Sequence, residues 1–378
     1  MIKRTRSLEE TISIVTSLSK EIGLTRLVDI TGLDNIGIPV YASVRPNAKL
    51  LQSNSGKGLT HKNAQCSALM EALEFYQAES IEDKETLMES EKKLLGTNTK
   101  IWSYNKLPCN ISRFYNSNNM IKWITFEDLL ENTLVLCPAD TTYFEENSFC
   151  ATNTNGLASG NNYEEALLHG ILEVIERHCY SNIIESNNII SNTIPQKIDW
   201  KTLPFLNAMN LCERIKNSGS EIYIMKLKSN LPVYCFWAVI IDKYSPQLVG
   251  AFNVGLGCDT SFENALIRAI TEAAQSRLVY IHGNREDIRH KATFRAKDGV
   301  PVNIINFFDG LPSINASELH LENEVRSHEV ETILKEVMES LKSNGHQNIL
   351  SHVLRKKKDE LSVVKVIIPS MKCETRLL

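Results

Sequence analysis

Hydrophobic residues recur at helical spacing in several stretches of the chain. This spacing predicts helices over 7–22, 62–80, 205–217, 262–281 and 324–343. Ser7 precedes the first helix and Glu10 follows three positions later, which is the arrangement of a capping box. Short apolar runs predict two strands within 26–46, joined by a turn, and further strands at 101–147, 221–228, 233–242 and 247–254.

Other segments have weaker patterns. A charged stretch at 82–95 is interpreted as a solvated surface helix, and residues 282–322, which hold Pro301 and Pro312, as irregular. The last segment, 349–369, is predicted to form a hairpin with the basic run 355–358 in its solvated turn. Helices and strands are mixed throughout and no low-complexity linker divides the chain. The expected fold is therefore α+β, a single large unit over 1–378.

Composition narrows the class of protein. The 378 residues are 43% hydrophobic and 23% charged, and the net charge of -4 predicts no general attraction to nucleic acid or to anionic membranes. The chain holds no apolar run long enough for a membrane span, and its first residues do not read as a secretory signal. The nine cysteines form no C-x-x-C pair, so we expect free thiols in a reducing cytoplasm.

Residues 169–178, HGILEVIERH, place two glutamates in apolar surroundings. Glu173 and Glu176 are three positions apart and share a helix face, whereas their neighbours are Ile, Leu and Val. A helix that is apolar on most of its circumference is usually buried. Two adjacent buried carboxylates require a cation or protons to neutralise them.

The same pattern occurs three times, in 56–75, 155–177 and 254–277. Each segment has an alanine at the start of its helical pattern, namely Ala64, Ala166 and Ala265. A glutamate follows seven positions later in every case, at Glu71, Glu173 and Glu272, and the tenth position holds Glu74, Glu176 and Gln275. Each helix follows a glycine-bearing loop and a predicted strand, so we expect three quasi-repeated strand–loop–helix segments.

Carboxylate oxygens without thiol or imidazole partners suit Mg²⁺, which normally also binds phosphate oxygens. The repeat therefore predicts a Mg²⁺-nucleotide site. The stretch SGKGLT at 55–60 does not satisfy the Walker pattern, and the pair Gly255 and Gly257 lacks the third glycine of a dinucleotide fingerprint. Those two glycines are expected to permit a tight turn or the approach of a ligand, and His169 and His178 are expected in the core or behind the ligands.

The three segments, with SALMEALE, EEALLHGILEVIER and ALIRAITEAAQSR at their centres, resemble the ATP-binding signatures of the YcaO superfamily, and the resemblance extends over nearly the whole chain. It implies ATP and Mg²⁺ as cofactors, ATP-binding segments at 56–80, 153–180 and 252–288, and activation of a peptide backbone amide by O-phosphorylation. The metal-binding positions of the family fall on Glu71, Glu74, Glu173 and Glu176. Its ATP-binding positions fall on Arg4, Thr11, Ser67, Asn155, Asn161, Glu165, Arg177, Gln275, Arg277 and Arg285. The chain departs from the family at Phe75 and His178, where arginine and aspartate are common, and no catalytic side chain is assigned.

The product depends on the branch of the family. Azoline-forming members tend to end in a proline-rich tail, whereas this chain ends VKVIIPSMKCETRLL, and its N-terminal half is more similar to the branch paired with TfuA proteins. The resemblance thus implies thioamide formation in a ribosomally made peptide or protein, a TfuA-like partner and a homodimer. Azoline or amidine formation remains open, as does a non-catalytic peptide-binding scaffold, although the presence of all four carboxylates argues against a scaffold.

Overall fold

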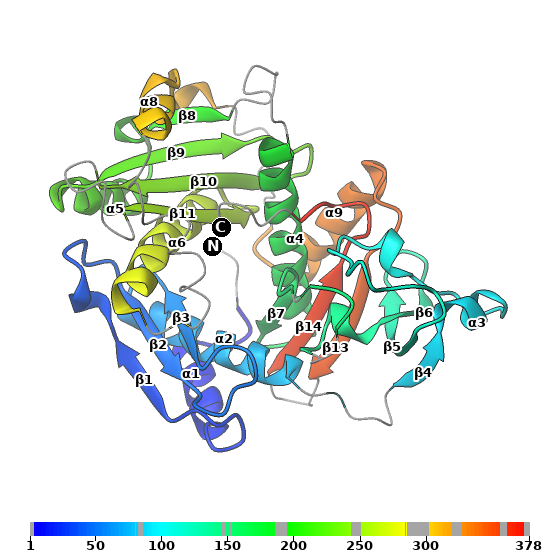
Figure 1. Ribbon diagram of the computed structural model, residues 1–378. Helices are drawn as coiled ribbons and strands as arrows, with labels where there is room; N and C mark the ends of the chain where they lie inside the picture. Colours follow the sequence, from blue (N-terminus) through cyan, green and yellow to red (C-terminus); the bar gives the residue numbers. More distant parts are fainter. Residues whose placement is uncertain are drawn as a thin grey trace.

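A computed structural model describes residues 4–79, 81, 86–144, 148–151, 153–185, 195–242, 251–283, 285, 302–319, 327–355 and 361–373. The described helices are α1 (Leu8–Ser17), α2 (His61–Ala78), α3 (Glu91–Leu95), α4 (Tyr163–Glu185), α5 (Leu206–Asn217), α6 (Phe262–His282), α8 (Val302–Gly310) and α9 (Val330–Ser343). They combine with three sheets, which confirms the expected α+β class (Figure 1).

The first sheet has the order β1-β2-β3, with β1 (Arg26–Asp29), β2 (Val40–Val44) and β3 (Ser53–Lys57). The second has the order β11-β10-β9-β8-β12, with β8 (Gln196–Asp199), β9 (Glu221–Leu227), β10 (Tyr234–Ile241), β11 (Phe252–Asp259) and β12 (Ser313–Asn315). The third has the order β4-β5-β13-β14-β7, with β6 (Thr133–Pro138) paired to β5 (Met120–Asp128). Its other strands are β4 (Leu87–Ser90), β7 (Leu157–Gly160), β13 (Leu350–Arg355) and β14 (Ser362–Ile367).

Three strand–loop–helix units build the centre of the molecule, as the repeat predicts. Helix α2 packs on β3, α4 on β7 and α6 on β11, and each of the three strands belongs to a different sheet. Each helix also contacts the strand of another unit: α2 contacts β7, α4 contacts β11 and α6 contacts β3. The three units therefore close on one another in a ring, and Figure 1 shows α2, α4 and α6 arranged around the centre of the molecule, between the three sheets.

Glycines allow this close packing of strand against helix. A Cβ atom on Gly56 of β3 would lie 1.9 Å from the backbone nitrogen of Ala68, and one on Gly257 of β11 would lie 2.1 Å from the carbonyl oxygen of Ala265. Gly255 faces the backbone of α6 in the same way. The expectation that Gly255 and Gly257 serve a turn or a ligand is therefore wrong, because both lie inside a strand and bring it against its helix.

Most periodic segments fold as predicted. Ser7 caps α1 with the expected capping box, and strand β10, with the sequence YCFWAVII, is buried along its whole length between β9 and β11. The strand expected at 247–254 is observed at Phe252–Asp259, and 247–250 lie outside the described residues. Of the helix expected at 324–343, α9 covers Val330–Ser343, while 324–326 are not described.

Three expectations are wrong. The charged stretch expected as a helix at 82–95 contains strand β4 and only the short helix α3, because 87–90 pair with β5. The region expected to be irregular contains helix α8, whose Phe308 packs against Tyr223 and Trp237. Arg355 belongs to β13 and is buried, donating from its guanidinium to Glu21 at 2.9 Å, so it is no part of a solvated turn; 356–358 lie outside the described residues.

No helix in the described part of the chain has both the length and the apolar character needed to cross a membrane.

Candidate functional site

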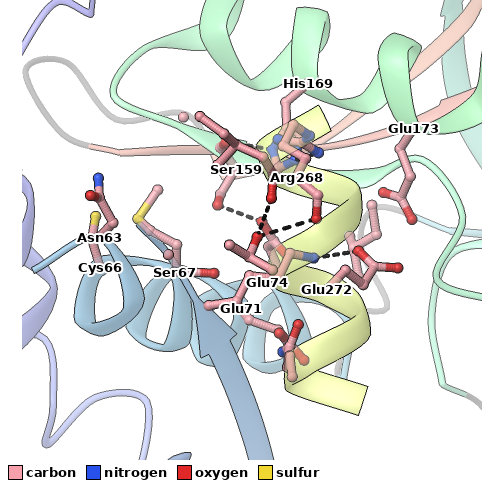
Figure 2. Close-up of a pocket in the computed structure, with 18 of the residues that line it drawn as sticks. Asn63, Cys66, Ser67, Glu71, Glu74, Ser159, His169, Glu173, Arg268 and Glu272 are labelled. Carbon is pink, nitrogen blue, oxygen red and sulfur yellow. Dashed lines mark hydrogen bonds and ion pairs between the residues drawn. The ribbon is translucent and has the colours of Figure 1, made fainter. Parts of the chain in front are cut away.

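The ring of three units encloses a cavity of about 760 Å³, bordered by α2, α4, α6 and the N-terminal segment. Twelve of the fourteen predicted site residues line it: Arg4, Thr11, Ser67, Glu71, Glu74, Asn161, Glu165, Glu173, Glu176, Arg177, Gln275 and Arg285. Figure 2 shows Glu71 and Glu74 from α2, Glu173 from α4 and Glu272 from α6 around one space. Residues that are up to 281 positions apart in the chain thus share one site.

The two remaining predicted residues lie elsewhere. Arg277 donates through Nε to Asp34 Oδ2 at 2.9 Å, and both side chains are largely buried. Asn155 borders a second, smaller cavity on the other side of the chain segment that precedes β7.

The repeat register explains how the carboxylates meet. Because seven positions correspond to nearly two helical turns, the glutamates at this spacing lie on the same face of each helix as the alanine that packs on the strand. Glu74 and Glu176 follow three positions later and project from that face too. Strand residues seven positions before the alanines link the units: the Ser159 hydroxyl donates to Glu74 at 2.5 Å, and Lys57 donates to Glu272.

Burial disfavours the charged form of several of these carboxylates. Glu176 is 3% exposed, and burial followed by the charge of Glu272 raises its pKa to about 7, although Arg177 and Arg268 oppose the rise. Burial raises the pKa of Glu74 to about 8 despite the hydrogen bond from Ser159. Burial also raises the pKa values of Glu71 and Glu173. The cavity therefore has a deficit of positive charge on its carboxylate side.

Cations border the same space. Arg177 approaches Glu176 Oε1 to 3.7 Å and lies 3.9 Å from an oxygen of Glu173 and of Glu272, all of which are longer than a good ion pair. Lys57 and Arg177 hold the pKa of Glu272 below its ordinary value against the effect of burial. The counter-charges of Glu272 thus outweigh the effect of its burial on its pKa, whereas the cations near Glu71 and Glu176 do not outweigh theirs.

The N-terminal segment borders one side of the cavity and is held there by contacts with residues at the start of α4. Thr5 donates its backbone N–H to Glu165 Oε1 at 2.7 Å, and Arg4 lies 3.3 Å from Glu165 Oε2. Thr11 donates its hydroxyl to Asn161 Oδ1 at 2.6 Å. The predicted residues Arg4, Thr11, Asn161 and Glu165 therefore form one connected group at the start of α4.

Four further residues belong to the site although their chemistry was not predicted: Lys57, Ser159, His169 and Arg268. The NH2 atom of Arg268 lies 3.5 Å from His169 Nε2, and its buried Nε has no hydrogen-bond partner among the described residues. Burial, followed by the charge of Arg268, lowers the pKa of His169 to about 3, so this imidazole is neutral at physiological pH.

Two of these residues, His169 and Arg268, occupy equivalent positions in the sequence repeat. Three positions after the first helical alanine stand Ser67, His169 and Arg268, and all three line the cavity. His169 is partly buried and contacts Arg268, but it lines the cavity itself, so it does not lie behind the lining residues as expected. His178 instead faces away and accepts a hydrogen bond from the backbone N–H of Lys372.

The donor set fits a Mg²⁺-nucleotide. Within the described ranges, no three Asp, Glu, His or Cys side chains converge closely enough to bind a metal ion on their own. Mg²⁺ typically takes one or two protein carboxylates and completes its shell with waters and phosphate oxygens, for which the two E-x-x-E pairs provide the carboxylates. Arg177, Arg268 and Lys57 line the same cavity and supply positive charge for phosphates.

Comparison with known proteins places this site in a family. The model of the family described as YcaO cyclodehydratase, ATP- and Mg²⁺-binding, matches residues 55–372. An uncharacterized protein of Methanothermobacter thermautotrophicus is 30% identical over 93% of this chain and 90% of its own length. An uncharacterized protein in the tfuA 3′ region of Rhizobium leguminosarum bv. trifolii is 26% identical over 97% of this chain and 87% of its own.

The fold agrees with a solved structure of the same family. The structure of YcaO from Methanopyrus kandleri, bound with AMPPCP and Mg²⁺, has a TM-score of 0.76 at 20% identity and covers 97% of this chain and 92% of that chain. The protein belongs to the YcaO family, a class of ATP-dependent peptide-modifying enzymes. The expected family, fold class and cofactors, ATP and Mg²⁺, are thereby confirmed.

Proposed function

We propose that this protein uses Mg²⁺-ATP to replace the oxygen of a peptide backbone amide with sulfur, which forms a thioamide. The observation that supports the nucleotide-dependent part is that the two E-x-x-E motifs, in which burial raises the pKa values of Glu74 and Glu176, share one cavity with Arg177 and Arg268. The thioamide product is supported by the Rhizobium relative in the tfuA 3′ region.

We assign separate roles in binding Mg²⁺ and ATP to the residues of the site. Glu71, Glu74, Glu173 and Glu176 hold Mg²⁺, and Arg177, Arg268 and Lys57 neutralise the phosphates. The remaining predicted ATP-binding residues surround the nucleotide, with Asn155 and Arg277 acting from outside the cavity through the segments they hold in place. Bound Mg²⁺-ATP supplies the phosphoryl group that turns the amide oxygen into a leaving group.

The cavity favours this chemistry in two ways. Its carboxylates are mostly withdrawn from solvent, which strengthens their interaction with a divalent cation. His169 remains neutral, so it serves to orient Arg268 rather than to carry a proton. The peptide or protein substrate, a TfuA-like partner for sulfur delivery, a homodimeric assembly and a cytoplasmic location complete the proposal.

Mass spectrometry tests the product directly. The full chain is expressed with a TfuA-like protein and a candidate peptide, and the peptide mass is compared with that from Glu71→Gln, which should be inactive, and from Glu164→Gln, a helix-α4 glutamate outside the cavity, which should be active. A mass gain that corresponds to sulfur replacing oxygen supports the proposal. Loss of one water from the peptide would instead identify azoline or amidine formation, and an unchanged mass with every partner would favour a scaffold.

A further inference from the structure

A second cavity of about 30 Å³ lies directly behind one wall of the ATP site. The wall is the chain segment that leads into β7. Thr154 and Leu157 of this segment line the large cavity, whereas Asn153 and Asn155 line the small one. Gly156 lies between them at φ +75°, and a Cβ there would meet the carbonyl oxygen of Val366 at 2.2 Å, so both the backbone conformation and the packing require glycine.

The small cavity contains a buried cation. Lys365 of β14 is 3% exposed, and its ammonium donates to the carbonyl oxygens of Asn153 at 2.7 Å and Asn155 at 2.8 Å. No carboxylate in the described part of the chain forms a direct ion pair with it, and burial lowers its pKa to about 8, although the charge of Glu173 opposes the shift. A buried ammonium without a direct ion-pair partner is destabilising, and this one has a third N–H to donate.

The other walls limit which anion could balance this charge. A space of about 30 Å³ accommodates one or two water-sized particles, which favours a small anion over phosphate, sulfate or a carboxylate. The thiols of Cys109 and Cys150 line it, which gives a soft, polarisable surface. Asn155 Oδ1 is buried without a hydrogen-bond partner among the described residues, so the cavity also offers an acceptor for a ligand's hydrogen.

We propose that this cavity is a hydrosulfide site, in which Lys365 holds HS⁻ beside the ATP site for use in thioamide formation. Hydrosulfide has a single heavy atom, one negative charge for the ammonium, one hydrogen for Asn155 Oδ1 and a soft sulfur for the two thiols. This proposal rests on the proposed function, because only the thioamide reaction consumes an external sulfur.

The reaction balances with this ion as the nucleophile. The sulfur of HS⁻ bonds to the amide carbon while the carbonyl oxygen takes the γ-phosphoryl group of ATP. The carbon–oxygen bond then breaks, phosphate leaves with the former amide oxygen, and the sulfur loses its proton to the phosphate. The products are the thioamide, ADP and hydrogen phosphate, and no oxidant or reductant is required.

Steady-state kinetics of the full chain test the site. Lys365→Met should raise the sulfide concentration for half-maximal thioamide formation by about tenfold or more and leave the KM for ATP unchanged. Lys226→Met, at a half-buried lysine of strand β9 in another sheet, should change neither value. Because Lys365→Met leaves two carbonyl groups unpaired, Cys109→Leu is tested too; it fills the cavity and should raise the KM for sulfide while keeping the lysine. An unchanged KM for sulfide in folded Cys109→Leu would overturn the proposal.

Direct binding separates this inference from the proposed function. Crystals of the wild-type chain are soaked without oxygen in hydroselenide, and anomalous scattering locates the selenium. A selenium peak beside Lys365 that persists in excess chloride and is absent from Lys365→Met supports the site, even if no thioamide is ever detected and the proposed function fails. Absence of a peak, or its full displacement by chloride so that the cavity binds an adventitious ion only, would refute it.

Discussion

Glu176→Gln should make the metal-free protein more stable and its complex with Mg²⁺-ATP weaker. The pKa of Glu176 is raised from 4.5 to about 7, chiefly by burial. The unfolded chain ionises this group near its ordinary pKa, so folding is penalised as the pH rises from 4.5 and the full penalty is present above about pH 7. The difference between the two pKa values corresponds to roughly 3 kcal/mol at pH 8 or above.

Glutamine keeps the shape of the side chain and removes this penalty. For a chain of 378 residues the unfolding entropy near the midpoint is about 0.8 kcal/mol/K, so about 3 kcal/mol raises Tm by roughly 4 °C. At about pH 5 the gain should nearly vanish. Mg²⁺-ATP should add less stability to the variant than to the wild type, because one of its carboxylate ligands is lost.

Differential scanning fluorimetry at about pH 5 and pH 8.5, with and without Mg²⁺-ATP, measures both effects. Glu164→Gln provides the matched control, since Glu164 begins the same helix outside the cavity. If Glu176→Gln has a lower Tm than the wild type at pH 8.5 and the same response to Mg²⁺-ATP, the assignment of Glu176 as an uncompensated metal ligand is wrong.

Two further predictions concern the pH dependence of binding and the role of Arg277. Binding of Mg²⁺-ATP should release protons and weaken as the pH falls from 8.5 to 6, because the pKa values of Glu74 and Glu176 are about 8 and about 7 and a metal displaces those protons. Calorimetry in two buffers of different ionisation enthalpy measures this; pH-independent affinity without proton release would contradict it. Arg277→Gln and Asp34→Asn should each destabilise the fold by about 3 kcal/mol, since each breaks a largely buried ion pair, and should leave nucleotide affinity within about twofold. Loss of affinity without loss of Tm in Arg277→Gln alone would place Arg277 at the nucleotide instead.

The long periodic segments could be predicted from the sequence because their apolar stripes are local. Helices α1, α2, α5 and α6 begin and end within a few residues of their predicted bounds, apart from the shorter end of α1. Strand β4 could not be found this way. Its four residues become a strand only by pairing with β5, some thirty positions later, and Leu87 and Met88 remain exposed. Helix α8 could not be predicted either, because the prolines at 301 and 312 in this stretch indicate an irregular segment.

The residues of the candidate site also divide into those with a local sequence pattern and those placed only by long-range contacts. The carboxylates could be predicted because they repeat at one register on three helices. Arg268 and His169 occupy a common register too, but as different residue types, so their similarity is one of position and not of chemistry. Lys365 had no local signal, since its neighbours along the chain are ordinary strand residues and its partners, Asn153 and Asn155, lie more than 200 positions earlier.

Because the three units close on one another in a ring, the stability of the whole protein should depend on the concentration of ATP. The ATP site takes side chains from Arg4 to Arg285 and from strands of three sheets, so no sheet retains it when the others unfold. A ligand that binds only the assembled ring stabilises every part of it, by about 2.7 kcal/mol when its concentration is a hundred times its Kd. Nucleotide depletion would thus act on the turnover of the whole chain, and resistance to proteolysis would follow the ATP concentration.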